Sequence, residues 1–65
     1  MPTQPTRILA RQVQPHDQIL ICGRPETVTR VEDHGEEIHV YAPDDPYDPY
    51  LFKDRELVTL IARPA

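Results

Sequence analysis

Prolines and turn-forming residues divide this chain of 65 residues into short segments. The sequence contains eight prolines, and a helix rarely continues through the residue before a proline. Between these breaks lie short runs rich in β-branched residues, which are typical of strands, at 18–22, 26–32 and 57–62. A fold built on a long helix is therefore excluded, and the sequence predicts an all-β protein.

The clearest local feature is a turn at residues 33–36, Asp-His-Gly-Glu, in which Gly35 is free to adopt a positive φ. The segment that follows alternates apolar and polar residues with a period of two, as a half-buried strand does. The predicted inward residues are Ile38, Val40 and Ala42, and the predicted outward residues are Glu37, His39 and Tyr41. We therefore predict a hairpin of residues 26–32 and 37–42.

The remaining segments are less regular. The pattern of residues 7–13 fits a strand or a short helix, and we favour a strand that ends at the turn 14–17. Residues 43–50 contain three prolines, which predicts an irregular loop. A tight turn or one turn of 3₁₀ helix is expected at 54–56, before the last strand.

The predicted architecture follows from the small hydrophobic core that a chain of this length can form. A chain this short buries only ~60% of its unfolded surface, and its single cysteine cannot form an intramolecular disulfide. We expect Cys22 to be a small buried residue within the apolar run 19–22. A closed sheet protects apolar side chains and strand edges better than an open one. We therefore expect a small, strongly bent, antiparallel barrel of five or six strands over residues 7–62, with tails at 1–6 and 63–65.

The order of these features resembles that of the SH3-like small β-barrels. The opening of such barrels often reads Val-x-x-Gly-Asp-x-Ile, and this chain matches it at Val13, Asp17 and Ile19. His16 stands where glycine is usual, and histidine tolerates a positive φ better than most residues. The resemblance implies a fold and no particular activity, since many unrelated functions use such barrels.

Charge is distributed unevenly along the chain, which has a net charge of −4. Residues 31–52 contain seven acidic residues and neither lysine nor arginine. Such a stretch repels phosphate, so nucleic-acid binding through it is not expected. Tyrosines are set among the acidic residues, and they supply rigid contact area of the kind found at protein interfaces. The predicted partner-binding residues are Tyr41, Asp44, Asp45, Tyr47, Asp48 and Tyr50.

Other chemistries have weaker support. The aspartates of 43–50 lack the alternation and the glycine of a calcium loop, and His34 and His39 alone are too few for zinc. No metal site and no cofactor is therefore predicted. The chain contains no serine, Cys22 lies in the most apolar run, and a domain of this size is expected to lack a pocket of ~300 Å³ or more. We do not expect an enzyme.

The sequence thus predicts a non-enzymatic interaction or accessory module that binds a protein with a basic surface. The alternative is a nucleic-acid-binding barrel that uses the arginines of the N-terminal half, Arg7, Arg11, Arg24 and Arg30. No apolar stretch approaches the ~20 residues that span a bilayer, and the N-terminus lacks the features of a signal peptide. We therefore expect a cytoplasmic protein without membrane contact, and the sequence leaves the oligomeric state open.

Overall fold

A computed structural model describes residues 5–64, without the side chains of Asp45 and Pro46. The fold is all-β. Its elements are β1 (Thr6–Leu9), the 3₁₀ turn η1 (Ala10–Gln12), β2 (Gln18–Ile21), β3 (Arg24–Thr27), β4 (Arg30–Asp33), β5 (Glu37–Ala42), β6 (Asp45–Lys53) and β7 (Leu57–Ala62). Within residues 5–64 the only helical element is this three-residue turn, so no helix there has the length and apolarity to cross a membrane.

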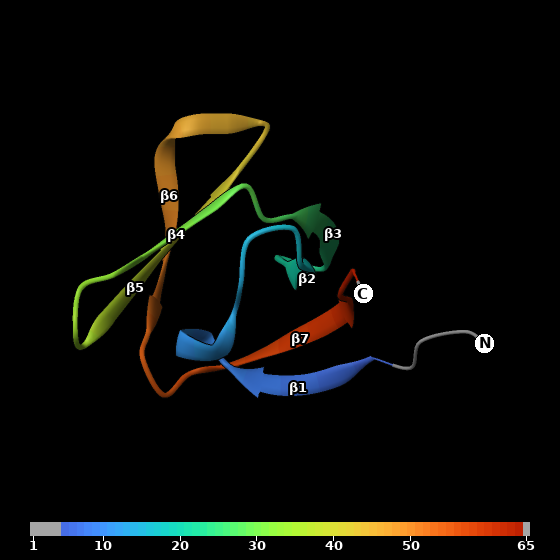
Figure 1. Ribbon diagram of the computed structural model, residues 1–65, viewed down its shortest axis with the longest axis horizontal. Helices are drawn as coiled ribbons and strands as arrows, with labels where there is room; N and C mark the ends of the chain where they lie inside the picture. Colours follow the sequence, from blue (N-terminus) through green and yellow to red (C-terminus); the bar gives the residue numbers. More distant parts are fainter. Residues whose placement is uncertain (1–4, 65) are drawn as a thin grey trace.

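The strands form two antiparallel sheets, which Figure 1 shows from one side. The first has the order β1-β7-β2-β3, and the second has the order β4-β5-β6. The β4–β5 hairpin extends away from the first sheet, on the left of Figure 1. The coarse prediction of a small all-β domain is thus confirmed. The strand pairing of residues 5–64 shows no closed barrel, so the predicted barrel and its SH3-like character are not confirmed.

The core lies between the two sheets and draws on both. Its largest fully buried apolar side chains are Ile19 of β2, Val28 between β3 and β4, and Ile38 and Val40 of β5. Ile38, Val40 and Ala42 are buried as the alternation predicts, and Gly35 has a φ of 83° in the turn before them. The predicted hairpin is thus confirmed, with Glu32 opposite His39 and Arg30 opposite Tyr41. Its first strand is shorter than expected, because the chain passes from one sheet to the other at Val28 and Thr29.

The N-terminal segment combines the two alternatives left open by its sequence. Residues 6–9 pair with β7 as a strand, and residues 10–12 form the 3₁₀ turn. The turn at 14–17 is confirmed by the hydrogen bond from Asp17 N–H to the Gln14 carbonyl, 3.1 Å long. His16 has a φ of 77°, the conformation that would favour the glycine of the SH3-like pattern. Residues 54 and 55 form the expected turn, with Glu56 N–H donating to the Lys53 carbonyl.

The prediction of an irregular loop at residues 43–50 was wrong, because strand β6 begins at Asp45 and includes Pro46 and Pro49. Two features of β6 accommodate these prolines. It is an edge strand, with β5 as its only neighbour in the sheet. Its pairing with β5 is also interrupted, since Tyr50 lies opposite Val40 whereas Asp45 lies opposite Ala42. The prolines therefore fall where the ladder does not require their missing N–H groups.

Cys22 also differs from the prediction, because it is exposed. Ile21 pairs with Arg24, which makes Cys22 and Gly23 the two central residues of the β2–β3 turn. Their φ angles are 52° and 77°, and a two-residue hairpin turn with both φ angles positive is type I′. The apolar run therefore ends one residue earlier than its composition indicated.

Replacement of Cys22 by asparagine is expected to stabilise the protein by about 0.5–1 kcal/mol. Asn-Gly is the preferred pair for this turn because asparagine tolerates a positive φ, which strains most other side chains. Urea denaturation under reducing conditions would measure the gain. Cys22→Ala is the matched control, since alanine removes the thiol without accommodating the turn. An equal gain from both variants would contradict the explanation.

Candidate functional site

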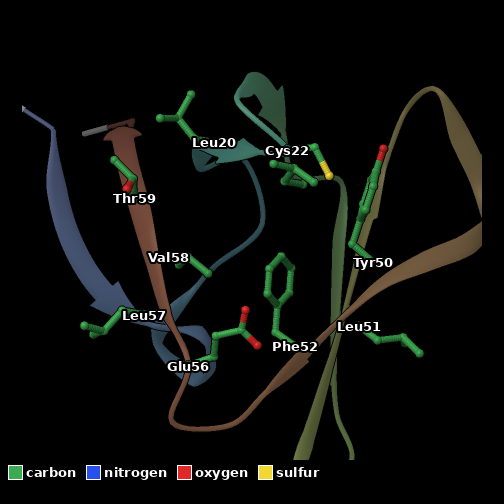
Figure 2. Close-up of a pocket in the computed structure, with 10 residues that line it drawn as sticks. Leu20, Cys22, Tyr50, Leu51, Phe52, Glu56, Leu57, Val58 and Thr59 are labelled. Atoms are coloured by element: carbon green, nitrogen blue, oxygen red, sulfur yellow. The ribbon is translucent and has the colours of Figure 1, made fainter.

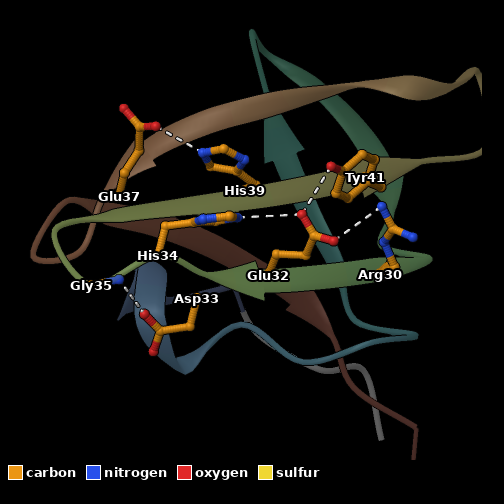
Figure 3. Close-up of polar contacts among 8 residues, drawn as sticks. All are labelled: Arg30, Glu32, Asp33, His34, Gly35, Glu37, His39 and Tyr41. Atoms are coloured by element: carbon orange, nitrogen blue, oxygen red, sulfur yellow. Dashed lines mark hydrogen bonds and ion pairs between the residues drawn. The ribbon is translucent and has the colours of Figure 1, made fainter.

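Six polar side chains from β4, β5 and the turn between them cover the outer surface of this hairpin, shown in Figure 3. We call this surface the hairpin face. Because paired residues of antiparallel strands point to the same side of the sheet, the register places Arg30 beside Tyr41 and Glu32 beside His39. The hairpin face consists of Arg30, Glu32, His34, Glu37, His39 and Tyr41.

Glu32 lies at the centre of the hairpin face and contacts three of its neighbours. Its Oε1 accepts a hydrogen bond from the Tyr41 hydroxyl at 3.1 Å and lies 3.3 Å from His34 Nε2. Its Oε2 lies 3.2 Å from Arg30 Nη2. The contacts with His34 and Tyr41 hold the pKa of Glu32 below its usual value. Glu32 is therefore an ionised carboxylate whose orientation is fixed from several sides.

Tyr41 was expected to be an accessible contact residue, but its side chain is largely covered. The Arg30 guanidinium carbon lies 4.2 Å from the centre of the Tyr41 ring, a cation–π distance. The residue is only 9% exposed. Tyr41 therefore orients Arg30 and Glu32, and it offers little surface to a partner.

The histidines of the hairpin face lie against each other. The ring centroids of His34 and His39 are 4.0 Å apart with an interplanar angle of 29°. His39 Nε2 lies 2.7 Å from Glu37 Oε1. One ligand atom each of Glu32, His34 and His39 lie within 4.8 Å of one another. These three residues could hold a metal ion, and the signal that the sequence analysis missed was the pairing of Glu32 with His39 across the Gly35 turn.

The structure separates the predicted acidic and tyrosine residues into two groups. Asp44, Tyr47 and Asp48 are exposed at the β5–β6 turn and the start of β6, and we call these three residues the turn patch. Tyr47 is 88% exposed. Tyr50 instead is half-buried and packs against the core. The side chain of Asp45 lies outside the described part of the structure.

A pocket of about 390 Å³ opens between β6 and the β2–β7 side of the first sheet. Figure 2 shows Phe52 of β6 and Val58 of β7 facing each other across it, with Cys22, Tyr50 and Glu56 around them. This volume corrects the expectation that so small a domain lacks a pocket above ~300 Å³. The strands that line the pocket belong to different sheets, since β6 lies in the second sheet and β2 and β7 lie in the first.

The arginines of the N-terminal half lie on four different elements. Arg7 lies on β1 and Arg24 on β3, which are opposite edges of the first sheet. Arg11 lies in the 3₁₀ turn, and Arg30 belongs to the second sheet, where it pairs with Glu32. Phosphate recognition requires concentrated positive charge, and the strand order separates Arg7 from Arg24.

A second charged cluster is structural rather than accessible. Asp17 is 0% exposed and is the only charged residue that is buried among the described side chains. Arg63 Nε and Nη2 donate to its two carboxylate oxygens at 2.9 and 2.8 Å, and Gln14 N–H donates at 2.9 Å. Burial raises the pKa of Asp17, but the bonds from Arg63 and Gln14 outweigh burial and hold this pKa below its usual value. Arg63, expected in a tail, therefore holds the loop before β2.

No family model, curated protein or solved structure matches the chain.

Proposed function

We propose that this protein is a non-enzymatic, SH3-like binding module that recognises a protein with a basic surface through the turn patch. The observation that carries the proposal is the exposure of Tyr47, at 88%, between the exposed acidic residues Asp44 and Asp48. It is the most exposed large hydrophobic residue among the described side chains.

The chemistry of the turn patch suits such a partner. A tyrosine ring buries a large area at the cost of fixing only two side-chain torsions, and tyrosine is enriched among the residues that dominate binding energy. Neighbouring carboxylates attract a basic surface and accelerate its approach. The net charge of −4 adds a long-range contribution of the same sign.

The SH3-like part of the proposal rests on strand order and on one turn. A first strand pairs with the last strand, and the last strand also pairs with β2. The turn before β2 has a positive φ at His16 and the aspartate of the family pattern at the next position. The scattered arginines give the alternative, a nucleic-acid-binding module, less support than the turn patch gives a protein-binding one.

Photo-crosslinking tests the proposal directly. The crosslinking amino acid p-benzoylphenylalanine replaces Tyr47 in one variant and Arg55 in the control. Arg55 is exposed in the β6–β7 turn, at the other end of the nine-residue strand β6. We expect a light-dependent adduct with a basic protein at position 47 and none at position 55.

The captured protein then allows a quantitative measurement. Tyr47→Ala is expected to weaken binding about 30-fold, which corresponds to about 2 kcal/mol for the loss of a central aromatic contact. The double variant Asp44→Asn, Asp48→Asn is expected mainly to slow association and to reduce its salt dependence. Equal crosslinking at both positions, or unchanged affinity of Tyr47→Ala, would contradict the proposal that the turn patch binds the partner.

A further inference from the structure

We infer that the hairpin face contains a zinc site formed by Glu32, His34 and His39. The inference is independent of the turn patch, since the site and the patch share no residue. Zinc takes imidazole nitrogens and carboxylate oxygens, commonly in a tetrahedral arrangement, and a three-residue set leaves the fourth position to water. Two histidines and one carboxylate are such a set.

The distances require only small movements for binding. With zinc–ligand bonds of ~2.0–2.1 Å, two ligand atoms of a tetrahedral site lie ~3.4 Å apart. His34 Nε2 and Glu32 Oε1 are already 3.3 Å apart, and the most distant of the three ligand atoms are within 4.8 Å of each other. His34 is exposed and Glu32 and His39 are partly exposed, so their side chains have room to close this gap.

Three further residues contact the ligands and hold them in place. Glu37 Oε1 lies 2.7 Å from His39 Nε2, and in Figure 3 Glu37 and Glu32 lie on opposite sides of the His39 ring. A proton on Nε2 that is held by Glu37 leaves the lone pair on Nδ1 for the metal. On the other side, Tyr41 and Arg30 hold the Glu32 carboxylate. The contacts that hold Glu32 and His39 are thus present before the metal arrives.

Zinc binding by both histidines has one structural consequence that an electrostatic attraction of zinc to the protein surface would not have. The imidazoles of His34 and His39 are stacked, with their centroids 4.0 Å apart. Each ring must turn a nitrogen toward a common point to share one ion, so the stacking has to open. The ring resonances of both histidines should therefore shift together on addition of zinc, while those of His16 stay in place.

Calorimetric titration with zinc alone tests the site, with NMR of the histidine rings as the second readout. We expect one zinc ion per chain, and a loss of affinity of at least tenfold in His34→Gln and in His39→Gln. Glu37→Gln is the more specific variant, because removal of a carboxylate that holds a metal-binding histidine typically costs 10–100-fold in metal affinity. All of these residues are at least partly exposed, so the variants should fold.

Two matched controls exclude other ligands. His16→Asn removes the histidine outside the cluster with a residue that tolerates its positive φ, and Cys22→Asn removes the only thiol. Neither should change the zinc affinity. The inference is overturned if zinc does not bind at millimolar concentration, if His34→Gln and His39→Gln bind as the unchanged protein does, or if either control abolishes binding.

Discussion

Asp17→Ala is expected to lower the free energy of unfolding by about 3 kcal/mol, the lower end of the range for breaking a buried ion pair. The substitution removes the acceptor for Arg63 and for Gln14 N–H at a position that is 0% exposed. The lower end of this range applies because the Arg63 side chain is 39% exposed. Water therefore replaces part of the hydrogen bonding that Arg63 loses with Asp17. A domain of this length has a total stability of only about 3–10 kcal/mol.

The milder pair Asp17→Asn and Arg63→Gln keeps the prediction measurable if the alanine variant is unfolded at room temperature. Urea denaturation of both single variants and of the double variant forms a double-mutant cycle. We expect a clear coupling energy, because each residue is the other's main partner. Strictly additive effects would show that Arg63 contributes nothing through Asp17.

The same carboxyl group makes stability depend on pH, with a sign that follows from its pKa. The pKa of Asp17 is lower in the folded protein than its ordinary value of 3.8. Its contribution is therefore fully present above the unfolded pKa and is lost as the pH falls through the folded one. Stability measured from neutral pH downward should fall below about pH 4, and Asp17→Asn should reduce the slope of this fall.

Ile38→Ala is expected to cost about 3–4 kcal/mol, which is comparable to the whole stability of the domain. Ile38 is 0% exposed and lies on the inner side of β5, opposite Phe52 of β6 and Asp33 of β4. Truncation to alanine leaves a cavity on the inner face of the three-stranded sheet. We expect that neither sheet can fill this cavity without shifting against the other.

Ile38→Val gives the graded comparison, since the loss of one methyl group costs about 0.5–1.5 kcal/mol. Arg55→Ala, in an exposed turn, is the surface control and should change stability by less than about 0.5 kcal/mol. Thermal and urea denaturation of the three variants measure the series. A cost for alanine no larger than that for valine would contradict the placement of Ile38 in the core.

Alternation and turn chemistry made the β4–β5 hairpin predictable from sequence. Ile38 and Val40 recur with the period of a half-buried strand, and Gly35 supplies the positive φ that its turn requires. Both signals are local, so they did not depend on knowledge of distant contacts. The expectation of a positive φ at His16 came instead from the SH3-like pattern, which has glycine at this position, and the structure has a φ of 77° there.

The errors arose where strand pairing and turn register decide the position of a residue. Cys22 was assigned to the core by the apolar run before it, although the turn register makes it a loop residue. Prolines were taken to exclude a strand at β6, although an edge strand with interrupted pairing accommodates them. Tyr41 was taken as accessible from its strand face, although Arg30 of the neighbouring strand covers its ring. The outcomes for β6 and Tyr41 depend on pairing with another strand, which local patterns do not encode. The outcome for Cys22 depends on the register of a tight turn, which the apolar run before it does not reveal.

The prolines of β6 have a consequence for the behaviour of the protein at high concentration. A strand with one open side offers backbone donors and acceptors to which another molecule can add, and this addition begins aggregation. β6 lacks the N–H groups of Pro46 and Pro49, and β3, at the border of the other sheet, lacks that of Pro25. One border of each sheet is therefore a poor template for a growing fibril.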